Sequence, residues 1–233
     1  MTQLHILSAG AAKGLLLAMQ ERFSAARGAT FNSTFGAVGA IREKLLAGAP
    51  CDLIVLTAAI IEALAEQRLV RASSVAALGS VLTGIAVPAA QAKPKIDSAS
   101  ALRDALAAAR GIYLPDPERA TAGIHFAGVL RALGIYDLVR ERLRPFPNGA
   151  AAMRAMADAG EPDLIGCTQV TEINYTAGVN LAGALPSEFE LATTYSLAVC
   201  TNAAEPALAL EIAAMLTGAE SRTLRVDGGF VVD

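Results

Sequence analysis

The chain has 233 residues, of which 54% are hydrophobic and 18% are charged, and its formal net charge at pH 7 is −3. That charge provides no basic surface for nucleic acid, and no uninterrupted apolar stretch reaches the roughly 20 residues that a membrane-spanning helix needs. The three cysteines lack metal-ligand spacing, so we expect buried free thiols, as in a reducing compartment. We therefore expect no nucleic acid, no membrane insertion, no metal and no cofactor.

The beginning of the chain alternates strand, glycine turn and helix twice. A strand over Leu4–Leu7 ends at Ser8-Ala9-Gly10, and apolar residues at helical spacing follow as far as Phe23. A second short strand closes at Thr34–Gly36, and Ala37–Leu46 is the next predicted helix. Helix N-termini behind strand ends present free N–H groups and a positive dipole end, which favour an anion. Because the first strand begins so early, we expect no signal peptide and a cytoplasmic protein.

The alternation continues through the rest of the chain. The further predicted strands are Asp52–Leu56, Ser80–Val87, Gly111–Leu114, Leu143–Phe146, Leu164–Cys167, Val179–Leu185 and Leu191–Cys200. The further predicted helices are Ala58–Gln67, Ala99–Arg110, Ile124–Leu133, Ala150–Ala159 and Glu205–Leu216. Alternating strands and helices of these lengths predict an α/β fold, with a mainly parallel sheet and helices on both faces.

Four segments carry a family resemblance: SAGAAKGLL at Ser8–Leu16, TFGAVGAIREKLLAGAPCDLIV at Thr34–Val55, DPERATAG at Asp116–Gly123 and LIGCTQVTE at Leu164–Glu172. In their order and spacing, the chain resembles the type II periplasmic-binding-protein fold, in particular the molybdate-binding components of ABC importers and their relatives. The resemblance covers nearly the whole chain. It implies two α/β lobes, residues 1–82 with 195–233 and residues 83–194, with a ligand cleft between them.

The resemblance also implies a ligand held at the ends of strands. Molybdate binders of this family offer hydroxyls from the first two turns and a tyrosine from the last strand–helix turn. Here those places hold Ala11, Ala37 or Val38, and Gln169, so side-chain donors for a tetrahedral oxyanion are lost. The positive charge of Lys13 suits a carboxylate instead. We therefore expect a small organic anion with two or three carboxylate groups.

The candidate ligand-binding residues lie at strand ends, in first helical turns or in the loops that join them. In the first lobe they are Ser8, Gly10, Ala11, Ala12, Lys13, Thr34, Gly36, Ala37, Val38 and Thr57. In the second lobe they are Arg119, Thr121, Ala122, Gly123, Asn148 and Gln169. Purely structural roles stay open, because hydroxyl and amide side chains at these places also cap helices, and Arg119 can pair with a neighbouring acid.

Two functions remain open at this point. One is a non-catalytic protein that binds a small anion. The other is an isomerase. Some proteins with this fold resemble aconitate isomerases, which move a proton along an unsaturated tricarboxylate. For that chemistry we select Lys13 to hold a carboxylate, and His125 and Glu172 to transfer protons. The oligomeric state is not predicted.

Overall fold

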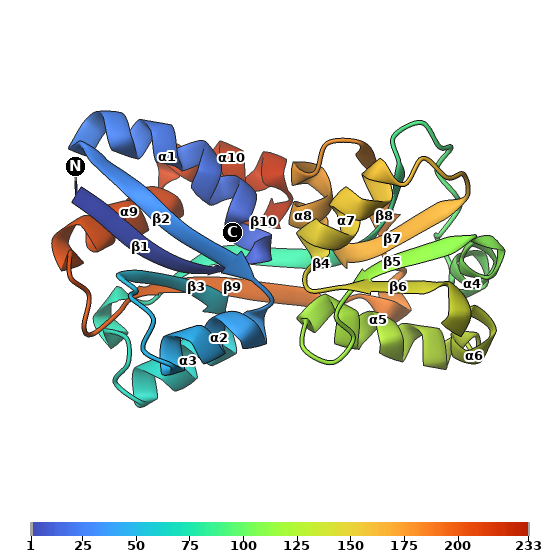
Figure 1. Ribbon diagram of the computed structural model, residues 1–233, viewed down its shortest axis with the longest axis horizontal. Coiled ribbons are helices and arrows are strands. Elements are labelled where there is room, and N and C mark those ends of the chain that lie inside the picture. Colours follow the sequence, from blue (N-terminus) through green and yellow to red (C-terminus); the bar gives the residue numbers. More distant parts are fainter. Residues whose placement is uncertain (1, 233) are drawn as a thin grey trace. The chain divides into compact units, whose positions relative to one another are not determined.

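The computed structural model describes residues 2–232, and their contacts group the chain into two compact units (Figure 1). Unit 1 comprises Met1–Val81 with Thr193–Asp233, and unit 2 comprises Leu82–Ala192. The sequence predicted the first boundary after residue 82 and the second after residue 194. These positions lie one and two residues further along the chain than the observed boundaries. Both observed boundaries lie in long strands, β4 (Ala76–Pro88) and β9 (Ala192–Val199).

The sheet of unit 1 is built from strand–helix repeats. Its strands are β1 (Thr2–Ala9), β2 (Ala29–Gly36), β3 (Leu53–Thr57), the first part of β4, β9 and β10 (Phe230–Val231). Its helices are η1 (Gly10–Ala12), α1 (Lys13–Arg27), α2 (Val38–Leu46), α3 (Ala58–Glu66), η2 (Ala72–Ser74), α9 (Pro206–Thr217), η5 (Ala219–Ser221) and α10 (Arg222–Gly228). Helices α1, α9 and α10 cover one face of this sheet, and α2 and α3 cover the other (Figure 1).

Unit 2 repeats the same kind of layering. Its strands are the second part of β4, β5 (Gly111–Pro115), β6 (Leu143–Phe146), β7 (Leu164–Gln169) and β8 (Val179–Ala184). Its helices are α4 (Ala99–Ala108), α5 (Thr121–Ala132), α6 (Tyr136–Val139), η3 (Arg140–Arg142), α7 (Gly149–Asp158), α8 (Val170–Tyr175) and η4 (Ser187–Phe189). Helices α7 and α8 lie on one face of the sheet, whereas α4, α5 and α6 lie on the other (Figure 1).

Strand pairing is mixed rather than mainly parallel. Strand β1 pairs in parallel with β2 and β3, and β5 pairs in parallel with β6 and β7. These strands are joined by helical crossovers, which parallel pairing requires. The strand pairs that are not joined by such a crossover are antiparallel. These pairs are β9 with β3, and β4 with β7, β8 and β10. The parallel part predicted from the strand–helix alternation is therefore correct, and the long strands make the rest antiparallel.

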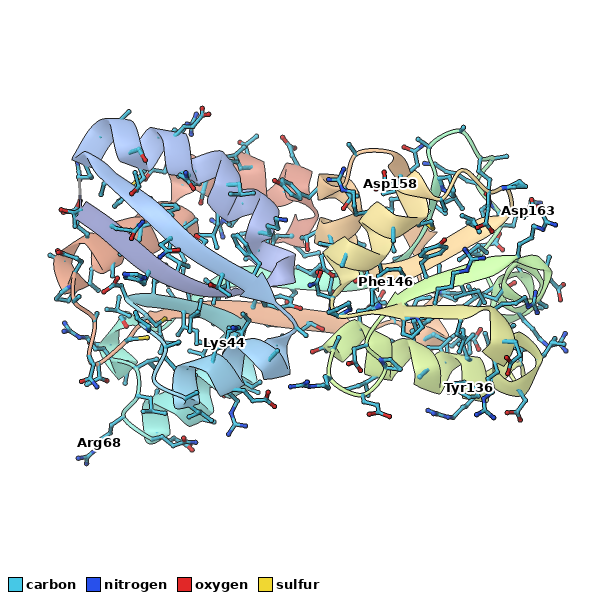
Figure 2. All side chains as sticks on the ribbon, in the orientation of Figure 1. Lys44, Arg68, Tyr136, Phe146, Asp158 and Asp163 are labelled. Carbon is cyan, nitrogen blue, oxygen red and sulfur yellow. The ribbon has the colours of Figure 1, made fainter. Side chains whose placement is uncertain are left out.

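Alternate side chains of the strands in unit 2 enter two separate cores. Ile85 and Ile112 pack with α4, α5 and α6, whereas their chain neighbours Ala86 and Tyr113 pack with α7 and α8. This is the period of two that a strand imposes when both faces of its sheet are covered. Phe146, labelled in Figure 2, extends the second core by stacking on Tyr113 with 5.8 Å between ring centroids.

A buried carboxylate links three separate segments of unit 1. Asp52 is 1% exposed, and its Oδ2 accepts the backbone N–H of His5 at 2.8 Å. Its Oδ1 accepts the backbone N–H of Glu205 at 3.0 Å, just before α9 begins. Two charge-assisted bonds to backbone donors compensate for burying the carboxylate. Asp52, which belongs to one of the segments that carry the family resemblance, therefore has a structural role.

Residues 2–232 contain no single helix with both the length and the apolar composition to cross a membrane, although the strongly bent pair Thr121–Ala132 and Tyr136–Arg142 meets that test jointly. Within the same range, histidine, cysteine, aspartate and glutamate side chains form no group of three or more that could hold a metal ion. All three cysteines are free thiols.

Candidate functional site

The parallel strands of unit 1 end at one edge of the sheet, which we call the unit 1 edge (Gly10–Lys13, Gly36–Val38 and Thr57). Helices α2 and α3 start there, and their N-cap residues Ala37 and Thr57 make no side-chain capping bond. The first N–H groups of a helix have no partner within the helix, and the dipole places positive charge beside them. The unit 1 edge therefore presents backbone donors that suit an anion.

Small buried residues line much of this edge. Gly10, Ala11 and Ala12 form the 3-10 helix η1, and all three are buried. Ala37 and Val38 are also buried at the start of α2. These residues are small and supply no side-chain hydrogen-bond donor. The structure thus places Ala11, Ala37 and Val38 just after the ends of strands β1 and β2, and contact of these residues with a ligand stays a prediction.

Lys13 contributes a positive charge at the unit 1 edge. It is the first residue of α1, directly after η1, and its side chain is half-buried. Its Nζ lies 5.8 Å from the centre of the Phe35 ring, at the outer range of a cation–π contact. A cation is disfavoured at a helix N-terminus by the dipole. Its position therefore agrees better with an anionic ligand than with a role in helix stability.

The three hydroxyl residues predicted for unit 1 differ in their surroundings. Ser8 is fully buried, and its Oγ donates to the carbonyl oxygen of Ala9 at 2.9 Å. Thr34, in β2, and Thr57, at the end of β3, are half-buried. Ser8 therefore already uses its hydroxyl proton within the fold, and ligand contact by Thr34 and Thr57 stays a prediction.

In unit 2, a folded loop positions the start of α5. The Oδ1 atom of Asp116 accepts the backbone N–H groups of Glu118 and Arg119 at 2.8 and 3.1 Å. A Cβ on Gly123 would lie 2.3 Å from the Asp116 carbonyl oxygen, so only glycine allows the loop to pack on the first turn. Ala120, the N-cap residue, makes no side-chain capping bond.

The start of α5 therefore carries the predicted backbone donors in unit 2. These are the N–H groups of Thr121, Ala122 and Gly123, which occupy the first three positions of the helix. We call these residues, together with His125, the α5 start. The helix begins three residues earlier than the sequence predicted, because the loop itself leads directly into the first turn. The side chain of Arg119 is exposed before it.

His125 lies one helical turn after Thr121, so the two side chains share a face of α5. The imidazole is half-buried, and its Nε2 lies 2.8 Å from the carbonyl oxygen of Phe189. A carbonyl oxygen only accepts, so Nε2 carries the proton of this bond. In the neutral ring, Nδ1 is then the basic nitrogen. The contact with Phe189 thus orients a group that can accept and return a proton.

Two other predicted residues of unit 2 have structural contacts. The Oδ1 atom of Asn148 accepts the backbone N–H of Ala151 at 2.9 Å and thereby caps α7. Glu172 is 6% exposed, and its Oε2 accepts the Thr168 hydroxyl at 2.5 Å. This carboxylate lies against the first residue of α7, Gly149, where the helix dipole favours negative charge. Asn148 and Glu172 thus both stabilise the start of α7.

The structure adds two residues that sequence reasoning did not select. Thr83 in β4 and Thr171 in α8 have buried hydroxyl oxygens without a hydrogen-bond partner among the described residues. Thr83 lies opposite Gln169, the buried residue that precedes α8. An unsatisfied buried hydroxyl costs about 1–3 kcal/mol, so each of these two groups would gain from a hydrogen-bond partner. Threonine in a strand or short helix carries no signal of this kind in the sequence alone.

Comparisons with known proteins agree with this architecture. A family model described as bacterial extracellular solute-binding protein matches residues 4–231. The chain is 22% identical over 237 residues to an aconitate isomerase from Pseudomonas sp, with 98% of this chain and 87% of that protein covered.

Solved structures give the same fold. The periplasmic molybdate-binding protein of Azotobacter vinelandii superposes with a TM-score of 0.80 at 20% identity, over 99% of both chains. The sulfate-binding protein SubI of Mycobacterium tuberculosis H37Rv gives 0.71 at 18% identity, over 99% of this chain and 86% of that one. The periplasmic-binding-protein fold predicted from the sequence is confirmed.

Proposed function

The chain belongs to the bacterial extracellular solute-binding protein family, and on that premise we propose that it binds a small organic polycarboxylate and isomerises it. The observation that carries the proposal is the composition of the unit 1 edge. Lys13 supplies a fixed positive charge there, whereas Ala11 and Ala37 supply no side-chain donor. Binding of a small anion fits the family, and the choice of a polycarboxylate rests on these residues.

Charge balance favours a carboxylate at this edge. A buried anion is costly unless a cation or several donors compensate for its lost hydration. Carboxylate oxygens accept strong charge-assisted bonds from an ammonium group and from helix N–H groups. Lys13 and the uncapped starts of α2 and α3 offer these two kinds of donor. In unit 2, the α5 start by itself offers backbone donors of the second kind.

The isomerase half of the proposal follows from His125. An allylic proton shift removes a proton from the saturated carbon beside a double bond and returns one to the far carbon of that bond. The double bond moves, no atom is gained or lost, and no oxidant is needed. The Nδ1 atom of neutral His125 can accept and return this proton, while nearby helix N–H groups stabilise the carboxylate on which negative charge develops.

Glu172 is the second candidate for proton transfer, and its surroundings make it less suitable. Its carboxylate is buried and accepts the Thr168 hydroxyl. Proton transfer would disturb that contact and the packing against Gly149. We therefore assign proton transfer to His125, and leave Glu172 as the alternative if His125 proves dispensable.

A non-catalytic binding protein is the second candidate function. The molybdate-binding and sulfate-binding proteins with this fold favour it, because their names describe binding alone. The 22% identity to an aconitate isomerase favours catalysis. Location bears on the choice, and the cytoplasmic location expected from the sequence stays a proposal that cell fractionation with an antibody would test.

Calorimetric titration of the full chain tests the ligand assignment. The panel contains an unsaturated tricarboxylate such as aconitate, a saturated tricarboxylate, molybdate and sulfate. We expect heats of binding from the tricarboxylates and none from the two inorganic anions. Tight binding of molybdate with no response to tricarboxylates would overturn the ligand assignment and leave the oxyanion-binding alternative.

A further inference from the structure

Cys51 and Cys200 are far apart in the sequence but adjacent in unit 1. Cys51 precedes β3 by two residues, and Cys200 directly follows β9, the antiparallel partner of β3. The backbone N–H of Cys200 donates to the Asp52 carbonyl at 2.9 Å, so the pairing of the two segments continues to this point. The two thiol groups therefore lie close enough to interact.

The pair differs from the third cysteine in both exposure and contacts. Cys200 is 3% exposed, whereas Cys51 is partly exposed, and its Sγ donates to the Leu53 carbonyl at 3.2 Å. Cys167 is fully buried among the apolar side chains of unit 2. Contact with Cys200 and burial raise the pKa of the Cys51 thiol, so Cys51 reacts slowly at neutral pH. Cys167 serves as an internal reference for a thiol without a neighbouring cysteine.

We propose that Cys51 and Cys200 form a disulfide bond when the protein meets a disulfide oxidant, such as oxidised glutathione or an oxidoreductase with an active-site disulfide. The Cys51 thiolate attacks one sulfur of the oxidant and releases the other as a thiolate. The Cys200 thiolate then attacks Cys51 in the mixed disulfide and releases the second thiolate. The pair loses two protons and two electrons, and the oxidant becomes two thiols.

The position of the pair gives this bond a specific consequence. The covalent loop between Cys51 and Cys200 encloses all of unit 2 in sequence, while the bond itself lies within unit 1. A cross-link that closes a long loop restricts the unfolded chain strongly and costs little in a folded state where the two ends already touch. The oxidised protein therefore resists unfolding more than the reduced protein. This inference is independent of the ligand and of any catalysis.

The test uses the full chain, fully reduced and then incubated with oxidised glutathione. Free thiols are alkylated after denaturation, and peptides are mapped by mass spectrometry without reduction. We expect a Cys51–Cys200 cross-linked peptide, alkylation confined to Cys167, and a higher Tm that reductant reverses. Cys167→Ala should still form the cross-link, whereas Cys51→Ser should form none and show no rise in Tm.

Three results would overturn the proposal. One is alkylation of all three cysteines after the wild-type protein has been exposed to the oxidant. Another is a stable glutathione adduct on Cys51 that Cys200 never displaces. The third is a cross-link found between two chains rather than within one, as shown by the mass of the intact protein.

Discussion

The Thr168 hydroxyl donates to the Glu172 carboxylate at 2.5 Å, and both groups lie against the Cα atom of Gly149. An added Cβ at Gly149 would stand 1.9 Å from Thr168 Oγ1 and 2.0 Å from Glu172 Oε2. This contact connects the start of α7 with the strand end and helix that follow it, β7 and α8. An acid that the sequence marked as a proton carrier is therefore held by packing and hydrogen bonding.

The first prediction concerns that contact. Gly149→Ala should lower the free energy of unfolding by about 1–3 kcal/mol, because the new methyl group overlaps two buried oxygens. Gly128→Ala is the matched control, since Gly128 is in the middle of α5 and an added Cβ there would meet nothing within 4 Å. In that position, alanine should raise stability by about 0.5–1 kcal/mol through helix propensity. Urea unfolding measures both, and an unaffected Gly149→Ala variant would contradict the packing described.

The second prediction concerns Asp52. Asp52→Asn should destabilise unit 1 by about 1–3 kcal/mol, because one carboxylate oxygen becomes an NH₂ group and one backbone N–H loses its acceptor. Asp104→Asn, on the exposed surface of α4, should change the unfolding free energy by less than about 0.5 kcal/mol. Equal midpoints for the two variants in urea would show that Asp52 does not have the linking role assigned to it.

The third prediction is a pH dependence in unit 2. Arg144 donates to both carboxylate oxygens of Glu161, at 3.1 and 3.0 Å, and thereby lowers the pKa of Glu161 below its ordinary 4.5. A lowered folded-state pKa means that the stabilising contribution is complete above the unfolded-state value and disappears as the pH falls through the folded-state value. Glu161→Gln should therefore be less stable than wild type near neutral pH.

The difference in urea midpoint between wild type and Glu161→Gln should shrink as the pH falls below 4.5. Glu66→Gln, at the exposed end of α3, is the control for changing a surface carboxylate. A difference between wild type and Glu161→Gln that stayed constant from neutral pH down to strongly acidic pH would contradict the ion pair.

The fourth prediction concerns binding. Lys13→Ala should weaken binding of an unsaturated tricarboxylate by about 10- to 100-fold, since a charge-assisted bond is worth about 1.5–3 kcal/mol. Lys44→Ala removes the same charge from the exposed last turn of α2, where Figure 2 labels Lys44, and should leave the Kd unchanged. Calorimetry on both variants measures these affinities. Equal losses of affinity would show that Lys13 acts only through long-range attraction between charges and does not contact the ligand.

The fifth prediction separates proton transfer from binding. His125→Gln should lower kcat by about 100-fold while leaving the Kd nearly unchanged, because the amide cannot accept and return a proton at neutral pH. The glutamine amide can still donate to the Phe189 carbonyl, so the local contact is preserved. His5→Gln changes the one other histidine, in β1, and should not affect turnover. Full activity in His125→Gln would move proton transfer to another group.

Local sequence patterns predicted much of the fold. The apolar runs with glycine turns predicted β1, β3 and β5, and the helical spacing after Gly10 predicted α1. The family resemblance supplied the overall fold. The antiparallel pairing of β4 and β9 was not predicted, because the partners of a strand depend on contacts between distant segments. Asp52 shows the same limit, since its hydrogen-bond partners lie 47 and 153 residues away in the chain.

The candidate site was predictable to a different degree. Backbone donors at the start of α5 follow from the order of loop, small residues and helix, which the sequence displays. Long-range packing decides the rest: the Gly149 contact engages Glu172, and burial leaves the Thr83 and Thr171 hydroxyls without partners among the described residues. The Gly149 contact has no local signature, because it joins residues from different strands and helices, and the burial of the two hydroxyls likewise depends on the packing of distant segments.

The central claim is that the bound carboxylate undergoes an allylic proton shift. The most direct measurement is proton NMR of aconitate in D₂O with the wild-type protein, followed over time beside a sample without protein. We expect that the other geometric isomer appears and carries deuterium from the solvent. If calorimetry shows that aconitate binds while the NMR spectrum shows neither isomer conversion nor deuterium uptake, the protein is a binder and the isomerase assignment is contradicted.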